Sequence, residues 1–263
     1  MTRHGAYIDP KKCKECGRCA ASCPYNAIAD LMRPCKKSCP VDAITMDEDN
    51  LVKIDEEKCI NCGSCIANCP FGAISDKSFI VDVIKLLKSG REVYAMVAPA
   101  IEGQFGKNVT IGMLESAIKD LGFTGMYEVS LGADYVAAHE AEELKEALAN
   151  GEKMTTSCCP AFVAMIRKHF PTLVDKMSNT VSPMAAIGHL VKEIHPGACA
   201  VFIGPCIAKK QEVLETVSLD GADYAITFEE LSAMFQAKDI DPSVYNNELQ
   251  QGSICLLYTS RCV

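Results

Sequence analysis

Short apolar segments alternate with longer amphipathic ones over the last two thirds of the chain. The apolar segments are too short and too evenly hydrophobic for surface helices, so each predicts a buried β-strand. They are Val93–Ala98, Met126–Val129, Ala200–Ile203 and Tyr224–Thr227. Helical patterns separate them, at Lys77–Lys88, Met113–Leu121, Ala133–Asn150, Ala161–His169, Pro183–Ile194 and Glu229–Ala237. The alternation predicts an α/β domain with a mostly parallel sheet, whose ligands bind at the loops that leave the strands.

Two of these helices begin with recognisable capping signals. Ser182 precedes Pro183, and proline is favoured at the first helical position. Thr227 stands three residues before Glu230, as in a capping box.

Cysteines divide the chain into two regions. Ten of the sixteen cysteines precede Phe71, and the alternating texture begins near Ile74 to Ser78. We therefore expect a small cysteine-rich domain over residues 1–75 and the α/β domain over residues 76–254.

Charge and hydropathy exclude several classes of protein. The 263 residues carry a net charge of −8, without the excess of Lys and Arg that a nucleic-acid surface needs. No apolar run approaches the length of a membrane span, and no apolar stretch follows the first charged residues. We expect a cytoplasmic protein without a membrane partner, whose cysteines are metal ligands, because a reducing compartment keeps thiols free.

Two cysteine runs share the spacing C-x2-C-x2-C-x3-C-P. They are Cys13, Cys16, Cys19 and Cys23, and Cys59, Cys62, Cys65 and Cys69. Three closely spaced thiolates suit three corners of an iron–sulfur cubane, whereas a zinc ribbon does not use three cysteines in series. From Cys13 to Ile74 the chain resembles two-cluster ferredoxins, which implies an α+β ferredoxin-like domain with two [4Fe-4S] clusters.

Paired runs of this kind exchange their fourth cysteine. The expected ligand sets are Cys13, Cys16, Cys19 and Cys69 for one cluster, and Cys59, Cys62, Cys65 and Cys23 for the other. A third copy of Cys-Pro-x-x-Ala-Ile begins at Cys39, but its run has only Cys35 before it. Either Cys39 displaces Cys23 as the distant ligand, or Cys35 and Cys39 are a remnant without metal. Because its run is complete, Cys23 is preferred.

Further cysteines lie in two loops of the α/β region. Cys158 and Cys159 follow Thr-Thr-Ser and precede a helix, whose N-terminus favours a thiolate, although a buried apolar pair is the simpler alternative. Cys206 lies in Gly-Pro-Cys-Ile-Ala-Lys-Lys-Gln-Glu. Thr-Ser-Cys-Cys-Pro and Pro-Cys-x-x-Lys-Lys-x-Glu resemble two signatures of the iron-only ([FeFe]) hydrogenases, and the similarity extends from Cys13 to about Ser253.

This resemblance implies an oxidoreductase that interconverts protons and H₂, with a soluble ferredoxin or another redox protein as electron partner. It also implies an H-cluster, a [4Fe-4S] cubane joined to a two-iron unit with CO, cyanide and a dithiolate bridge. Residues implied for the cofactor are Cys159 and Cys206 as cubane ligands, Lys209 beside a cyanide, and Pro99 and Ala100 beside the two-iron unit.

For proton transfer the resemblance implies Cys158, Glu140, Glu143 and Ser178. Alone, the two glutamates would fit a solvated helix face.

The chain also departs from the family pattern. Gly204 stands where the family usually has Met, Ala100 replaces a frequent Ser, and the third signature is absent. Residues 255–263 resemble the translation of a sequencing-library end, so we expect the natural protein to continue beyond about Ile254. The chain as given should bind two clusters and lack hydrogenase activity. The alternatives are a non-catalytic iron–sulfur assembly factor and a sensory relative.

Overall fold

A parallel β-sheet forms the centre of the larger domain. The computed structural model describes residues 8–9, 12–13, 17–25, 27–28, 32–49, 51–215 and 221–246. Cys16 and the expected artefactual tail, residues 255–263, lie outside these ranges. The described residues form a four-stranded sheet in the order β4-β3-β5-β6. Its strands are β3 (Val93–Val97), β4 (Gly125–Glu128), β5 (Cys199–Ile203) and β6 (Tyr224–Ile226).

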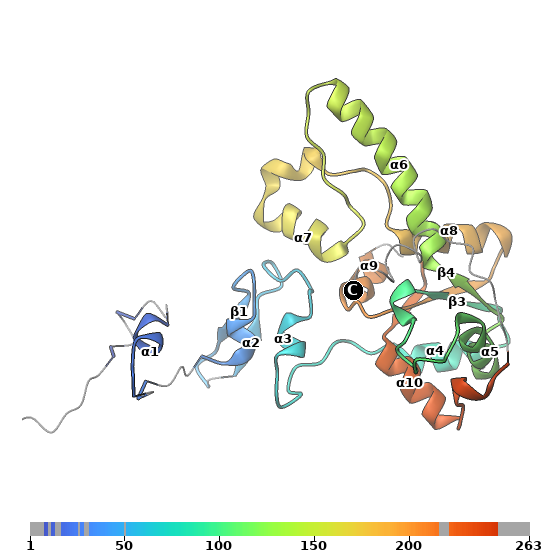
Figure 1. Ribbon diagram of the computed structural model, residues 1–263, viewed down its shortest axis with the longest axis horizontal. Helices are drawn as coiled ribbons and strands as arrows, with labels where there is room; N and C mark the ends of the chain where they lie inside the picture. Colours follow the sequence, from blue (N-terminus) through green and yellow to red (C-terminus); the bar gives the residue numbers. More distant parts are fainter. Residues whose placement is uncertain are drawn as a thin grey trace, which may run out of the picture.

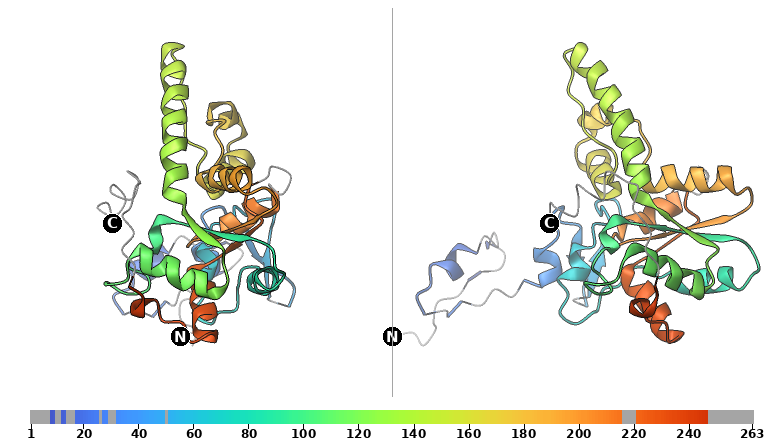
Figure 2. Two further views of the ribbon diagram at one scale, coloured as in Figure 1. Left: turned by 90° about the vertical axis from the view of Figure 1, so that its right-hand side faces the viewer. Right: turned by 45° about the vertical axis from the view of Figure 1, so that its right-hand side comes forward.

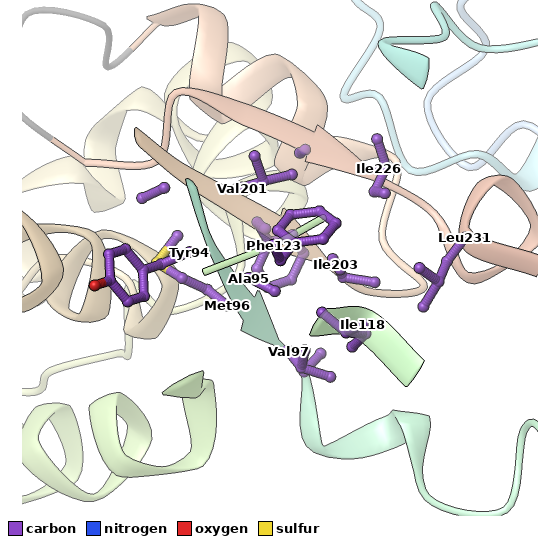
Figure 3. Packing of buried hydrophobic residues seen from close by; sticks show 14 of the residues in the cluster. Tyr94, Ala95, Met96, Val97, Ile118, Phe123, Val201, Ile203, Ile226 and Leu231 are labelled. Atoms are coloured by element: carbon purple, nitrogen blue, oxygen red, sulfur yellow. The ribbon is translucent and has the colours of Figure 1, made fainter. Parts of the chain in front are cut away.

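All neighbouring strands of this sheet are parallel, as the sequence pattern predicted. The two central strands, β3 and β5, pair from Val93 with Cys199 to Val97 with Ile203, and every residue in them is buried. Strands covered on both faces read as continuous apolar runs, because neither face meets water. Their side chains meet Ile118, Phe123 and Leu231 in the core (Figure 3).

Helices cover both faces of the sheet (Figure 1). On one side lie α4 (Ile80–Leu87), α5 (Ile111–Leu121) and α10 (Phe228–Ala237), and on the other α8 (Pro183–Ile194) and α9 (Ala208–Glu215). The predicted caps are confirmed, because Ser182 Oγ accepts from the Ala185 N–H at 3.3 Å and Thr227 Oγ1 from the Glu230 N–H at 3.2 Å. The sequence pattern did not predict α9.

Two further helices project from the sheet (Figure 2). They are α6 (Val129–Ala149) and α7 (Pro160–His169). Helix α6 begins four residues earlier than the predicted Ala133, because β4 runs directly into it. Within the described part of this domain, short 3₁₀ turns lie at Pro99–Ile101, Pro171–Lys176 and Pro242–Val244. No helix among the described residues is long and apolar enough to cross a membrane.

Helix α6 crosses α8 at a glycine. A Cβ added at Gly132 would lie 2.5 Å from the Pro183 carbonyl oxygen and 2.8 Å from Ile187 Cγ1. We therefore expect Gly132→Ala to push the helices apart and lower the free energy of unfolding by about 1–3 kcal/mol, measured by urea denaturation. Ala138→Ser, on the exposed face of α6, should leave it within about 0.5 kcal/mol. Equal stability of the two variants would contradict this packing.

The cysteine-rich domain is small and of the expected α+β type. It contains α1 (Arg18–Ala21), α2 (Pro34–Lys37), β1 (Ile44–Met46), β2 (Val52–Ile54) and α3 (Ser64–Ala67). Strands β1 and β2 are antiparallel, with Ile44 opposite Ile54. Helix α2 packs against α3, whereas α1 lies apart from both (Figures 1 and 2).

Candidate metal centres

A large cavity lies at the carboxyl ends of the central strands. It has a volume of about 1110 Å³ and is bordered by the loops after β3, β4 and β5. In the sheet order β4-β3-β5-β6, the connection from β3 to β4 runs toward one edge of the sheet, and the connection from β5 to β6 runs toward the other edge. The direction of the connections therefore reverses between β3 and β5. Ligands of parallel sheets bind in the crevice at such a reversal.

Most of the residues that the signatures single out meet in this cavity. Its walls include Pro99, Ala100, Cys158, Cys206 and Lys209. Pro99 and Ala100 form the turn after β3, and Cys206 lies between β5 and α9. Cys159 is the exposed N-cap of α7 and is not among the lining residues. Segments far apart in the sequence thus bring two thiols and an ammonium group to one space.

The ammonium group of Lys209 is held by a carboxylate on the same helix. Lys209 is only 8% exposed, and its Nζ lies 2.6 Å from Glu212 Oε2. A charged donor in a poorly solvated wall interacts strongly with an anion, because little water screens it. The lysine is therefore placed to bind an anionic group in the cavity. The orienting Glu212 was part of the signature, but the sequence alone assigned it no contact.

Gly204 has no room for a side chain. A Cβ there would lie 2.5 Å from Phe202 Cζ and 3.1 Å from Ala98 Cβ. Phe202 is buried and lines the cavity. The aromatic ring thus takes up space at the position where the family usually has Met, an arrangement that the sequence alone did not indicate.

The carboxylate of Glu140 binds the loop that carries Cys158. Thr156 Oγ1 donates to Glu140 Oε1 at 2.7 Å, and the Ser157 N–H donates to the same oxygen at 3.1 Å. The Cys158 N–H in turn donates to Thr156 Oγ1 at 3.4 Å. Glu140 on α6 is therefore linked to Cys158 through Thr156, which the sequence analysis did not single out.

One turn further along α6, Glu143 binds a second loop. Ser178 Oγ donates to Glu143 Oε2, and the Asn179 N–H donates to Glu143 Oε1 at 3.3 Å. The two loops are themselves joined, because the Ser178 N–H donates to the Thr155 carbonyl oxygen at 2.8 Å. The structure thus brings Cys158, Glu140, Glu143 and Ser178 into one region.

A second cavity, of about 360 Å³, separates the cysteine-rich domain from the α/β domain. Its lining cysteines are Cys39, Cys59, Cys62 and Cys65. Cys23, the expected partner of the last three, is not among them. Burial raises the pKa of the Cys65 thiol, backbone N–H groups oppose this shift, and the neighbouring Cys59 and Cys62 add to it. A positive centre beside Cys65 would favour its thiolate form.

Hydrogen bonds and packing connect the two domains at this cavity. Lys168 Nζ, at the end of α7, lies 2.8 Å from the Glu56 carbonyl oxygen and 2.7 Å from that of Cys59. His169 Nε2 lies 2.8 Å from the Lys58 carbonyl oxygen. Gly63 lies so close to Ile207 that an added Cβ would be 2.8 Å from Ile207 Cδ1. Ile207 directly follows Cys206, so the two cavities lie on either side of one loop.

Within the described ranges, no group of three or more His, Cys, Asp or Glu side chains converges as for a single metal ion. A cubane is ligated differently, because each thiolate binds a different iron atom. Four cysteines line the smaller cavity, which is the number of thiolates that a [4Fe-4S] cluster takes.

Comparison with known families agrees with this arrangement. The family model described as "Iron only hydrogenase large subunit, C-terminal domain" matches residues 91–255. The chain belongs to the iron-only hydrogenase family. Two further family models match the cysteine-rich region of this chain, a 4Fe-4S binding domain over residues 6–29 and an LdpA Fe-S cluster-binding domain over residues 29–80. The expected iron–sulfur ferredoxin-like region is thereby confirmed.

Individual relatives include characterised hydrogenases. Iron hydrogenase 1 of Clostridium pasteurianum is 31% identical over 87% of this chain and 43% of its own length. The periplasmic [Fe] hydrogenase large subunit of Nitratidesulfovibrio vulgaris is 33% identical over 90% of this chain and 59% of its own length. The chain therefore spans about half of the length of these relatives.

Other similarities concern the fold and a non-hydrogenase relative. A solved structure of apo [FeFe]-hydrogenase HydA1 from Chlamydomonas reinhardtii matches 67% of this chain and 52% of its own, at 25% identity and a TM-score of 0.58. The expected α/β fold is confirmed by this match and by the sheet. The cytosolic Fe-S cluster assembly factor NAR1 of Kluyveromyces lactis is 27% identical over 55% of this chain and 26% of its own length.

The residues around the large cavity are compatible with part of an H-cluster. Cys206 and the ammonium of Lys209 line the large cavity, where they suit iron and an anionic ligand. Cys159 caps the helix that begins beside Cys158. Among the described residues, Cys159 and Cys206 are the two candidate ligands for this cubane, which takes thiolates at its iron corners. The fit to an H-cluster is therefore partial.

Proposed function

We propose that the complete protein containing this chain catalyses 2H⁺ + 2e⁻ ⇌ H₂, with electrons entering through two N-terminal [4Fe-4S] clusters. The observation that carries this proposal is the large cavity, where Cys158, Cys206 and Lys209 meet at the reversal of the sheet order. Family membership alone supports only an oxidoreductase-type enzyme, whereas this constellation supports the specific reaction.

In this proposal Cys159 and Cys206 bind the cubane of the H-cluster, and Lys209 donates to an anionic ligand of its two-iron unit. The H-cluster, when bound, supplies the metal chemistry that couples electrons to protons. Glu212 keeps the Lys209 ammonium in place, because its Oε2 lies 2.6 Å from Nζ. Pro99 and Ala100 form the part of the cavity wall that follows β3.

Proton movement is assigned to the cysteine and the carboxylates of α6. Cys158 exchanges a proton with the reacting region, and Glu140, Glu143 and Ser178 carry it outward. The hydrogen bond from Ser178 to Glu143 supports the outer step of this route, because a proton moves between groups within hydrogen-bond reach. The hydrogen bond from Thr156 holds Glu140 against the loop of Cys158.

Electron entry is assigned to the cysteine-rich domain. The contact of Gly63 with Ile207 supports this assignment, because it places the smaller cavity next to the loop of Cys206. Ferredoxin-type clusters of some classes have potentials of about −400 mV, which suits exchange of electrons with a soluble ferredoxin. Reducing conditions that keep thiols free also favour a cytoplasmic location for the protein.

The proton route predicts a large effect of Glu140→Gln in the complete, matured enzyme. Glutamine keeps the hydrogen-bonding shape but has no proton to exchange, so we expect H₂ production to fall about 100-fold. Glu142→Gln, exposed on the same helix, should keep wild-type activity. Iron content should be equal in both variants. Equal H₂ production by the two variants would remove Glu140 from the route.

The similarity to NAR1 favours one second candidate, a non-catalytic iron–sulfur assembly factor. Such a factor has no use for the buried Lys209–Glu212 pair or for carboxylates bound to the Cys158 loop. The matured complete protein should therefore evolve H₂ from a chemically reduced electron donor. Transfer of its clusters to apoproteins without any H₂ would support the assembly factor instead.

A further inference from the structure

The cysteine-rich region contains three copies of one local structure. Each copy places a cysteine at the second position of a four-residue helix, namely Cys19 in α1, Cys35 in α2 and Cys65 in α3. In each copy a further cysteine follows four residues later and precedes proline. A two-cluster ferredoxin needs only two such halves. The pairing of the three copies therefore decides which cysteines share a cluster.

The structure pairs the second copy with the third. Ser64 Oγ donates to the Ser38 carbonyl oxygen at 3.0 Å, and Ser38 Oγ donates back to the Ser64 carbonyl oxygen at 3.3 Å. The two halves also repeat one turn, because the Ala43 N–H lies 3.2 Å from Cys39 Sγ and the Ala73 N–H lies 3.3 Å from Cys69 Sγ. These reciprocal contacts define one module built from residues 35–44 and 59–74.

The first copy stands outside this module. Helix α1 lies away from α2 and α3 in Figure 1 and in the right-hand view of Figure 2. The family models divide the region at the same place, with one match over residues 6–29 and the other over residues 29–80. Cys23 thus belongs to the separate copy, and Cys39 belongs to the module.

We propose that Cys39, and not Cys23, is the fourth ligand of the cluster held by Cys59, Cys62 and Cys65. All four of these cysteines line the 360 Å³ cavity between the domains. The assignment rests on the proposal that the chain carries [4Fe-4S] clusters, and it gives Cys39 a role that the spacing alone left open. Cys39 is the last cysteine of the second copy, as Cys69 is the last cysteine of the third. In paired halves of this kind the last cysteine of one half binds the cluster of the other, so Cys39 is the ligand for the cluster of Cys59, Cys62 and Cys65.

The same comparison shows that the module holds one cluster. Cys59 and Cys62 precede Cys65 by six and three residues, and the positions at these distances before Cys35 are Ala29 and Met32. The equivalent half-site around Cys35 and Cys69 therefore lacks two thiolates. The other cluster depends on the separate run at Cys13, Cys16 and Cys19.

The α/β domain completes the surroundings of this cluster. Ile207 and Lys210 line the cavity from α9 and the loop before it, and Lys168 donates to the carbonyl oxygen of the ligand Cys59 at 2.7 Å. A cluster with four thiolates is anionic, so the Lys168 ammonium favours it, whereas the charge of Lys210 is balanced by Asp76 and Glu230. The cluster thereby lies between the ferredoxin-like halves and the catalytic domain.

The test uses the whole chain in a background that leaves only this cluster. Cys13→Ala, Cys16→Ala and Cys19→Ala are combined to remove the separate run, and Cys39→Ala or the matched control Cys23→Ala is added. Each protein is purified without oxygen, and iron, sulfide and the EPR spectrum of the reduced form are measured. We expect about four irons in the background and in the Cys23→Ala variant. Cys39→Ala should lose the [4Fe-4S] signal, and any remaining centre should contain three irons or fewer.

A second substitution separates ligand loss from misfolding. Cys39→Ser keeps the volume of the side chain, and we expect either loss of the cluster or an altered EPR spectrum, while the thermal unfolding of the α/β domain is unchanged. An intact, unaltered [4Fe-4S] cluster in the Cys39 variants, or its loss in the background or with Cys23→Ala, would overturn the assignment. A wild-type chain that contains zinc or no metal would instead overturn the proposed function.

Discussion

Replacing Cys158 by serine in the complete, matured enzyme should lower the rate of H₂ production by about a thousandfold. Cys158 lines the large cavity and its loop is bound to Glu140 through Thr156. An alcohol has nearly the same shape as a thiol but releases its proton far less readily, so the relay would lose its inner member while its geometry is kept. The measurements are the H₂ rate and its pH profile, with iron content determined on the same sample.

A matched cysteine serves as the control for this prediction. Cys199 is buried at the start of β5, at the opposite end of that strand from the cavity. Cys199→Ala should keep the H₂ rate close to that of the wild type. Full activity of Cys158→Ser with normal iron content would show that protons reach the cavity by another route.

Replacing Lys210 by methionine should cost about 3–5 kcal/mol of the free energy of unfolding. Lys210 is only 4% exposed, and its Nζ lies 2.5 Å from Asp76 Oδ2 and 2.7 Å from Glu230 Oε2. It also donates to the Lys77 carbonyl oxygen at 3.2 Å. Methionine fills the space but leaves two carboxylates facing each other without a cation, which is the costly way to break a buried ion pair.

Urea denaturation of the anaerobically purified chain measures this loss, and iron analysis shows whether a cluster is lost with it. Lys192→Met is the matched control, because the Lys192 side chain is 23% exposed and that of its partner Asp223 31%. A pair open to water contributes less, so we expect a change of about 1 kcal/mol or less. Similar losses in the two variants would mean that the Asp76–Lys210–Glu230 group does not act as a buried unit.

Lys209 and Lys210 also explain why one helix was missed. Helix α9 begins Ala-Lys-Lys-Gln-Glu, which has no apolar stripe and looks like a solvated segment. Both lysines are nevertheless buried, because Glu212 binds one of them and Asp76 and Glu230 bind the other. Partners at distant positions decide such burial, so hydrophobic periodicity cannot reveal it. The strands were predictable for the opposite reason, because burial on both faces leaves a continuous apolar run.

The residues of the candidate site could be predicted from the sequence where they belong to short signature motifs. The resemblance of two signatures to those of a known family singled out Cys158, Cys206 and Lys209, which line one cavity. It could not reveal that Phe202 takes up the space beside Gly204, since that depends on how a ring turns in the fold. Nor could it choose between Cys23 and Cys39, because that choice depends on which helices pack together.

Lys168 and His169 hold the cluster-bearing loop only through the carbonyl oxygens of Glu56, Lys58 and Cys59. Every residue type presents the same carbonyl, so the exposed side chains of Glu56 and Lys58 are not constrained by the attachment. Substitutions that reverse the charge at these two positions should therefore leave the attachment of the loop to α7 intact.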